Sequence, residues 1–273
     1  FVILTFLLAK AADWQALFSG LMGIGEGYRW LPPKLPIFTF LGALAYAGAG
    51  GNLNLAQSFY IKDKGFGMGA HANCSTSQVR GHSPISKKPR LEGYRFPLTV
   101  TMLGRFKAWW RLMSFEHALV FWMTGLATML ILALLSYVTV YNSGAPIPHG
   151  VQFLFVQASV IASLTHSLVG TMFLGIVAWM LYSTHLTITD STSRILAENV
   201  VLLNKNIFKP ESLSSWYKLA VWLQILIGCG VLLIGLSEPF LLVTIGAALN
   251  AFTMLIYSFL IWKLNSTQLP KPI

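Results

Sequence analysis

The sequence ALAYAGAGGNLNLAQS occupies residues 43–58. It lies within an apolar run of membrane length, residues 35–61, yet three glycines and two asparagines interrupt its middle. Inside a bilayer, non-helical backbone persists only where protein buries it or where it lines a water-filled cavity. Glycine is also the residue that disfavours a helix most after proline. The pattern predicts a broken helix at a functional site, non-helical across about Gly48–Asn52.

Oxygen atoms are concentrated at this break. The first half-helix ends with unpaired carbonyls and the negative end of its dipole, and amide side chains begin the second half. Carbonyl and amide oxygens suit hard cations, and broken helices near the membrane midplane hold the ion in many secondary transporters. Because Asn52 and Asn54 lie about 200° apart on a helical wheel, at most one of them is expected to bind the ion. The predicted metal-binding residues are Ala47, Gly48, Asn52, Asn54, Gln57 and Asn250.

The composition of the chain is that of an integral membrane protein. It is 55% hydrophobic and 10% charged, against roughly 25% charged residues in a soluble domain. A span needs about 20 apolar residues, and the sequence predicts an all-α protein with one transmembrane region over residues 1–273. The apolar run 151–161 is too short to span, and we expect it to lie along the surface or to begin the next span. The expected spans cover residues 1–22, 35–61 (broken), 118–140, 164–186, 216–236 and 239–262.

Basic residues alternate across the expected loops. The loop 62–116 is rich in Lys and Arg, whereas the loops that precede residues 164 and 239 contain neither. The positive-inside rule therefore places loop 62–116 in the cytoplasm, and we expect the plasma (cell inner) membrane as the location. The net charge of +10 makes membrane lipid with anionic headgroups a natural partner. Nucleic acid is not expected as a partner, because the basic residues flank spans instead of covering a soluble face.

Two segments carry a resemblance to a known family. Residues 48–58, with the core Asn52-Leu53-Asn54-Leu55, resemble the sixth transmembrane helix of the Nramp family of divalent-metal transporters. The Ser/Thr-rich stretch 183–194 is similar to the eighth helix of that family. The chain thus resembles a divergent prokaryotic-type member, with its six spans matching helices five to ten of a LeuT-type inverted-repeat fold.

This resemblance implies secondary transport of a divalent metal cation by alternating access around a mid-membrane site. The metal would be the transported substrate, and no resident cofactor is expected. The resemblance also implies a partner for the chain in the missing N-terminal helices of the same protein, since the family's Asp-Pro-Gly-Asn motif is absent here.

The chain departs from the family pattern at the metal site. Aligned on Asn52-Leu53, the family's metal-binding methionine falls at Ala49, and its two histidines fall at Gly51 and Ala56. Loss of the thioether favours a harder ion of the Mn²⁺ or Mg²⁺ type. Since neither Gly51 nor Ala56 titrates, we expect the ion's own gradient and the membrane potential to drive transport.

Other polar residues in the spans have two interpretations each. Asn250 lies near the middle of the last span with Thr253 on the same face, and either ion binding or an interhelical hydrogen bond would explain it. Asp190 and Arg194 have the spacing of a favourable helix pair, and we favour a structural pair over a gate.

No arrangement typical of catalysis occurs in the sequence, so we expect no enzyme. It contains no His-Glu-x-x-His motif and no carboxylate pair within an expected span. Two other classes of protein stay open beside the ion transporter. One is an amino-acid or amine transporter of the same fold, and the other is a membrane subunit that transports nothing.

Overall fold

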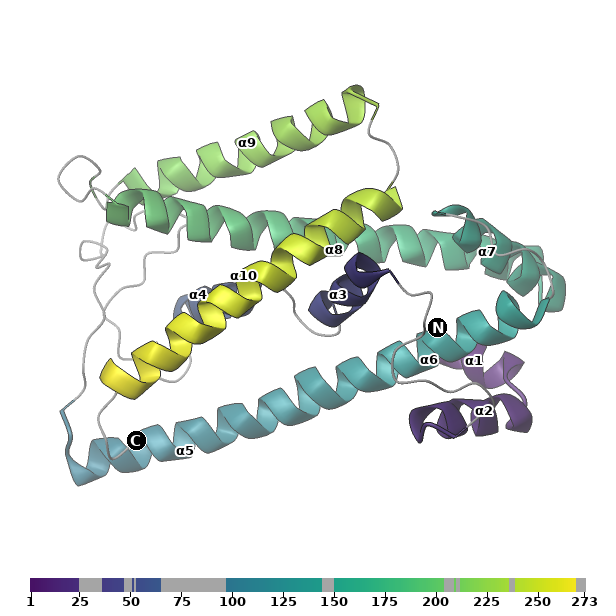
Figure 1. The fold of residues 1–273 in the computed structure, drawn as a ribbon, viewed down its shortest axis with the longest axis horizontal. Coiled ribbons are helices and arrows are strands. Elements are labelled where there is room, and N and C mark those ends of the chain that lie inside the picture. The colour runs from purple at the N-terminus through teal and green to yellow at the C-terminus, as the bar shows by residue number, and fades with distance from the viewer. Residues whose placement is uncertain are drawn as a thin grey trace. The chain divides into compact units, whose positions relative to one another are not determined.

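The computed structural model describes residues 1–24, 36–46, 51, 53–64, 97–143, 150–203, 209, 212–235 and 239–268. Most of these residues are helical, and no strand occurs among them (Figure 1). The helices are α1 (Val2–Leu8), α2 (Ala11–Leu21), α3 (Ile37–Tyr46), α4 (Leu53–Lys64), α5 (Val100–Glu116), the π-helix η2 (His117–Met123), α6 (Thr124–Thr139), the 3-10 turn η3 (Tyr141–Ser143), α7 (Gln152–Leu164), α8 (Ser167–Leu203), α9 (Leu213–Leu233) and α10 (Pro239–Gln268).

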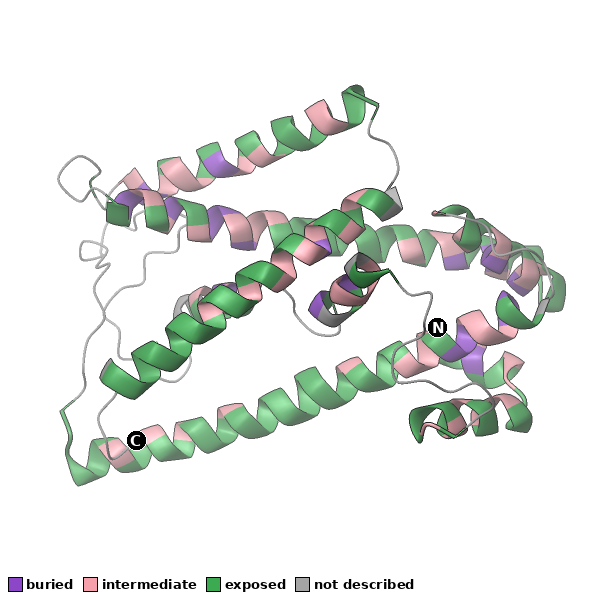
Figure 2. Cartoon of the chain, viewed as in Figure 1, coloured by how far each residue is buried: buried purple, intermediate pink, exposed green. Residues whose placement is uncertain are grey.

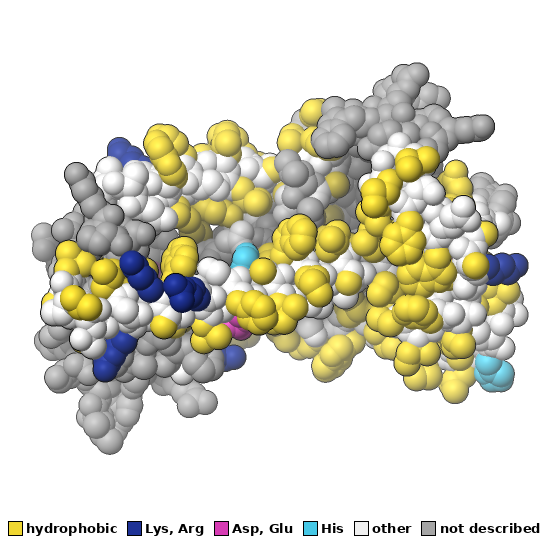
Figure 3. Space-filling view, turned by 90° about the horizontal axis from the view of Figure 1, so that it is seen from below, with side chains coloured by type: hydrophobic (Ala, Val, Ile, Leu, Met, Phe, Trp, Pro, Cys, Tyr) yellow, Lys and Arg dark blue, Asp and Glu magenta, His cyan; other side chains and the backbone are white. Residues whose placement is uncertain are grey.

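Four helical stretches of the described residues are long and apolar enough to cross a membrane. Within their most apolar windows, only 6–11% of the residues are buried inside the chain, and Figure 2 shows the same exposure along the ribbon. Figure 3 shows hydrophobic side chains over much of the described surface of one face. So much exposed apolar surface is typical of a membrane-embedded protein. The four stretches are Val100–Thr139, Ser167–Leu203, Leu213–Leu233 and Leu241–Thr267.

The predicted break in the second span is confirmed at Gly51, whereas the other residues of the predicted non-helical stretch, 48–50 and 52, lie outside the described residues. Helix α3 ends at Tyr46, and the next helix, α4, begins at Leu53. Gly51, which lies between them, is in a turn with φ +64. A positive φ is strained for residues with a side chain, so glycine is the residue that fits this turn.

The first expected span, residues 1–22, is divided in the structure. Helices α1 and α2 form a pair bent by 114°. Ala9 and Lys10 are both extended, and the Asp13 carboxylate accepts a hydrogen bond from the Lys10 backbone N–H at 2.8 Å. This acidic side chain satisfies an amide at the helix start, and so α2 begins anew after the bend.

The expected loop 62–116 also differs in its C-terminal part. Thr99 accepts a hydrogen bond from the Met102 N–H at 3.3 Å through its hydroxyl, and α5 begins at Val100. From there the helix continues through η2 into α6 as one 40-residue stretch. Cap chemistry at Thr99 explains where the helix begins, and the absence of proline from residues 98–145 explains why it continues.

Two further boundaries differ from the expected spans. The run 151–161 is part of a separate short helix, α7, and the next helix, α8, has 37 residues. At 1.5 Å per residue, α8 is about 55 Å long, whereas the hydrocarbon core of a bilayer is about 30 Å thick. Helix α8 is therefore longer than a span requires.

The chain divides into two compact units, and each has a small core. The first unit comprises Phe1–Leu44, Ser114–Ser183 and Glu238–Gly246. Its core packs α1, α6, α7 and α8 around Leu135, Ala158, Ile161 and Phe173. The buried Thr5 hydroxyl lies 3.4 Å from the Ile131 carbonyl oxygen of α6.

Helices α7 and α8 approach closely at Gly170. A Cβ atom on Gly170 would lie 2.5 Å from the Ala158 carbonyl oxygen and 2.8 Å from the Ala162 Cβ. Glycine at this position lets the two backbones touch, as small residues do between membrane helices.

The second unit comprises Ala45–Met113, Thr184–Ser237 and Ala247–Ile273. Ala197, Val201 and Leu213 form its apolar core and join the end of α8 to the start of α9. Trp216 and Tyr217 pack against this cluster.

We predict that Gly170→Ala destabilises the protein, because its added methyl group collides with α7. Overpacking of this kind costs about 1–3 kcal/mol in the free energy of unfolding. Gly175→Ala on the same helix is the matched control, because a Cβ there meets no atom of the described residues within 4 Å. It should leave the protein as stable or stabilise it by about 0.4–1 kcal/mol. Thermal unfolding followed by tryptophan fluorescence measures both, and equal midpoints for the two variants would contradict the close approach.

Candidate ion site at the helix break

The break after α3 lies against helix α10. A Cβ atom on Gly51 would collide with the Asn250 Oδ1 atom and lie 2.6 Å from the Asn250 Cγ. Gly51 is buried and Asn250 is half-buried. The side-chain oxygen of Asn250 therefore faces the backbone of the break, and the absence of a side chain on Gly51 permits this approach.

A second contact joins the first turn of α4 to α10. The Asn54 Nδ2 atom donates a hydrogen bond to the Tyr257 Oη atom at 3.0 Å. Tyr257 lies seven residues after Asn250, so the two side chains share a face of α10 by helical periodicity. One face of α10 thus contacts this region through two side chains: the Asn250 amide lies against Gly51, and the Tyr257 phenol binds Asn54.

The structure brings together some of the predicted metal-binding residues. Asn250 lies against Gly51 and Asn54 bonds Tyr257 of α10, and both Asn54 and Gln57 are exposed on α4. The Thr253 hydroxyl donates to the Leu249 carbonyl of its own helix at 3.0 Å. The other predicted residues, Ala47, Gly48 and Asn52, lie outside the described residues.

The side chains of this region that could bind a cation have neutral oxygen atoms. The Asn250 and Asn54 side-chain oxygens and the Tyr257 phenol are groups that can replace part of the water shell of a hard cation. Among the described residues, no group of three or more His, Cys, Asp or Glu side chains is placed to hold a metal ion. The described part of the region therefore offers an uncharged set of oxygen ligands.

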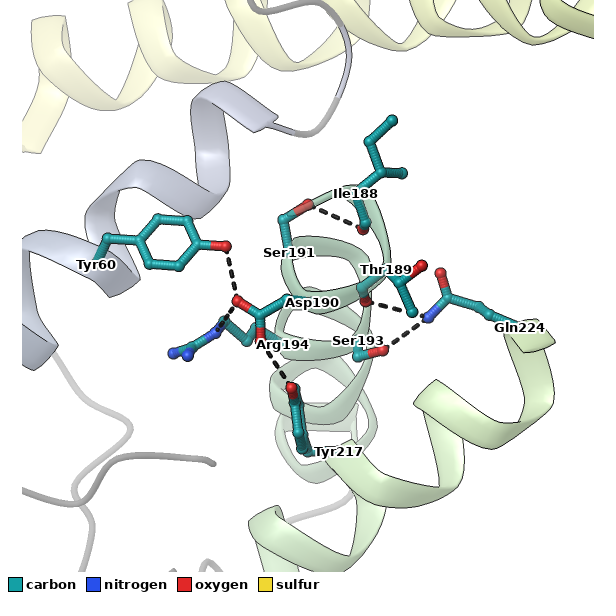
Figure 4. A network of polar contacts seen from close by, with 9 residues as sticks. All are labelled: Tyr60, Ile188, Thr189, Asp190, Ser191, Ser193, Arg194, Tyr217 and Gln224. Carbon is teal, nitrogen blue, oxygen red and sulfur yellow. Dashed lines mark hydrogen bonds and ion pairs between the residues drawn. The ribbon is translucent and has the colours of Figure 1, made fainter. Parts of the chain in front are cut away.

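A second polar cluster lies at Asp190 on α8 (Figure 4). The Tyr60 Oη atom of α4 donates to Asp190 Oδ2 at 2.7 Å, and the Tyr217 Oη atom of α9 donates to Asp190 Oδ1 at 2.6 Å. The Arg194 Nε atom donates to Asp190 Oδ2 at 3.0 Å. The predicted pair of Asp190 and Arg194 is confirmed, and two tyrosines extend it to three helices.

An amide of α9 contacts α8 close to this cluster. Gln224 of α9 donates through Nε2 to the Ser193 hydroxyl at 2.7 Å (Figure 4). Ser193 is fully buried, and the Arg194 side chain is almost so. These bonds fix α9 beside the second half of α8.

Sequence reasoning missed four residues of these clusters: Tyr60, Tyr217, Tyr257 and Gln224. Tyrosine near a span end is expected as an interface anchor, so its type gave no signal for a polar cluster. Gln224 did offer a signal, because an amide inside an apolar span is a candidate for a specific contact.

Comparisons with protein-family models, with curated proteins and with solved structures gave no match. The class of the protein therefore rests on its own residues: a membrane-embedded chain whose described part is helical, with a helix break at Gly51.

We predict that Gly51→Ala damages the break for two separable reasons, a positive φ and a collision with Asn250. Gly235→Ala is the matched control, because Gly235 has φ +87 and a Cβ there would meet no atom of the described residues within 4 Å. That control should cost about 1–2 kcal/mol in stability from backbone strain alone. Gly51→Ala should cost about 1–3 kcal/mol more from overpacking.

The double variant Gly51→Ala/Asn250→Ala separates the two causes. It should regain the stability that Gly51→Ala loses through the collision, because the side chain that blocks the new methyl group is gone. It should still lack the stability lost through backbone strain. Thermal unfolding midpoints of the three proteins give the comparison. If Gly51→Ala is no more destabilising than Gly235→Ala, Asn250 does not lie against the break.

Proposed function

We propose that the protein is a secondary transporter of a divalent metal cation of the Mn²⁺ or Mg²⁺ type. The ion would bind at the break between α3 and α4 and cross the membrane by alternating access. The observation that supports this function is the contact of Gly51 with Asn250, which sets a side-chain oxygen against non-helical backbone. Non-helical backbone and oxygen ligands together are what ion sites in broken-helix transporters use.

The ligand set favours a hard cation over a soft one. Asn250, Asn54 and Tyr257 supply oxygen atoms, and neither sulfur nor imidazole is among these groups. Amide, carbonyl and water oxygens suit Mg²⁺ and Mn²⁺, whereas thiolate and thioether ligands select softer metals. A partly hydrated ion fits a site whose ligands are neutral, because retained water supplies the rest of the coordination shell.

An amino-acid or amine transporter is the second candidate function. The N-terminal end of α4, at Leu53, carries the positive end of a helix dipole and backbone N–H groups that have no acceptor within the helix. Such an end binds a substrate carboxylate in some broken-helix transporters. Direct binding separates the two candidates, because calorimetry with Mn²⁺ alone should show heat for the ion transporter and none for the other. A membrane subunit that transports nothing would bind neither.

The proposed setting is the plasma membrane, with the basic loop that follows α4 in the cytoplasm and anionic lipid as its partner. Lys and Arg in that loop supply the charge asymmetry on which this orientation rests.

We predict that Asn250→Ala lowers Mn²⁺ binding and uptake by the full-length protein in liposomes. Loss of one oxygen ligand to a charged group is worth roughly 10- to 100-fold in affinity. Asn199→Ala is the matched control, because it removes an exposed amide of α8 whose Nδ2 atom donates to the Ile195 carbonyl of its own helix. Isothermal calorimetry and uptake of radioactive Mn²⁺ provide the measurements. Unchanged affinity in Asn250→Ala, with the control also unchanged, would contradict the site.

We also predict that metal import proceeds without proton import. The aligned positions Gly51 and Ala56 cannot titrate, so the break itself carries no proton acceptor at these two positions. The membrane potential supplies about 2.3 kcal/mol per charge at 100 mV, and roughly twice that for a divalent ion. A pH-sensitive dye inside Mn²⁺-loading liposomes provides the measurement. Luminal acidification that follows metal uptake would show the prediction to be wrong.

A further inference from the structure

The Asp190 carboxylate binds two helices through different oxygen atoms. Its Oδ2 atom accepts from Tyr60 of α4 at 2.7 Å, and its Oδ1 atom accepts from Tyr217 of α9 at 2.6 Å (Figure 4). Arg194 binds the Oδ2 atom through Nε at 3.0 Å and places its guanidinium carbon 5.1 Å from the centroid of the Tyr60 ring. Hydrogen bonds to a charged acceptor are stronger than those between neutral groups.

The two helices that bind Asp190 differ in their other contacts with α8. Helices α8 and α9 are also joined by the Gln224 to Ser193 hydrogen bond and by the apolar cluster of Ala197, Val201 and Leu213. The contact of α4 with α8 is through Tyr60, near the C-terminal end of this 12-residue helix. We therefore take the α8–α9 pair, which these additional contacts join, as the fixed side of the cluster and α4 as the side that moves.

Separation of Tyr60 leaves the carboxylate paired. Asp190 would still accept from Tyr217 and from Arg194 when the Tyr60 hydroxyl moves away. Loss of one hydrogen bond costs far less than leaving a partly buried charge without partners. The cluster thus has the chemistry of a contact that opens and closes reversibly.

Helix α4 begins beside the helix break, so it links the break to the Asp190 cluster. Its first turn contacts α10 through Asn54, and its last turns contact α8 through Tyr60. A rigid helix of this length transmits a displacement of one end to the other.

We propose that Asp190 is a positioning residue and that Tyr60 and Asp190 form a latch, which holds α4 against α8 and α9 and releases it when α4 moves. The role of this movement in opening the ion site depends on the proposed function. The latch itself depends only on the contacts between α4, α8 and α9.

Spin-label distances between α4 and α9 test the latch in the full-length protein. Labels would be placed at Lys64→Cys and Ser215→Cys, which are exposed positions on the two helices. Cys74 and Cys229 would be replaced by serine in this background. Tyr60→Phe keeps the ring and removes the hydroxyl, so it should raise the ratio of long-distance to short-distance populations roughly tenfold.

Tyr217→Phe is the matched control, because it removes a hydroxyl that donates to the same carboxylate from the fixed side. It should leave the α4–α9 distance distribution close to that of the parent protein, whereas Asp190→Asn should shift it as Tyr60→Phe does. Tyr182→Phe, which removes an exposed phenol elsewhere on α8, should change nothing. Thermal unfolding midpoints show whether each variant is folded.

The latch is overturned if Tyr60→Phe and Asp190→Asn give the parent distribution. It is also overturned if Tyr60→Phe and Tyr217→Phe shift the distance distribution equally, because the two tyrosines would then be equivalent structural contacts of Asp190. Mn²⁺ uptake by the same variants is a separate measurement. If no protein, including the parent, moves Mn²⁺, the proposed function fails while the distances still decide the latch.

Discussion

The close contact of Gly51 with Asn250 depends on a property that glycine alone has. The backbone there has φ +64, and the space where a Cβ would stand is filled by the Asn250 side chain. Either condition disfavours other residues, and together they make glycine necessary at this position. The contact brings an amide oxygen of α10 to backbone that has left the helix, which is the physical basis of the proposed ion site.

The two polar clusters that α4 contacts differ in charge. Near its start, Asn54 meets a phenol of α10, and the contact involves no ionised side chain. Near its end, Tyr60 meets the ionised pair of Asp190 and Arg194. Neutral oxygens leave room for the charge of an incoming cation, whereas a paired carboxylate is already satisfied. This difference is consistent with the proposed ion binding at the first cluster and the proposed latch at the second.

Much of the fold could be predicted from hydrophobicity and glycine content. The break at Gly51 followed from three clustered glycines, and the last two spans from long apolar runs. The bend at Ala9 and Lys10 could not be predicted in this way, because a local contact of Asp13 decides it within an otherwise apolar run. The same holds for α5, which begins at a Thr99 cap within a segment whose basic residues suggested a loop. The pairing of Tyr60 with Asp190 joins residues far apart in the chain, and neither residue type predicts which residue it will contact.

The most direct test of the ion site is the position of Mn²⁺ in an experimental structure of the full-length protein. Anomalous scattering from crystals grown with Mn²⁺ would locate the ion independently of any assumed ligands. The proposed site predicts an anomalous peak beside Gly51, with the Asn250 Oδ1 atom within about 2.0–2.6 Å of it or joined to it through one water, as for hard divalent ions. A peak elsewhere in the membrane region, or no peak at a Mn²⁺ concentration that saturates transport, would contradict an ion site at the helix break.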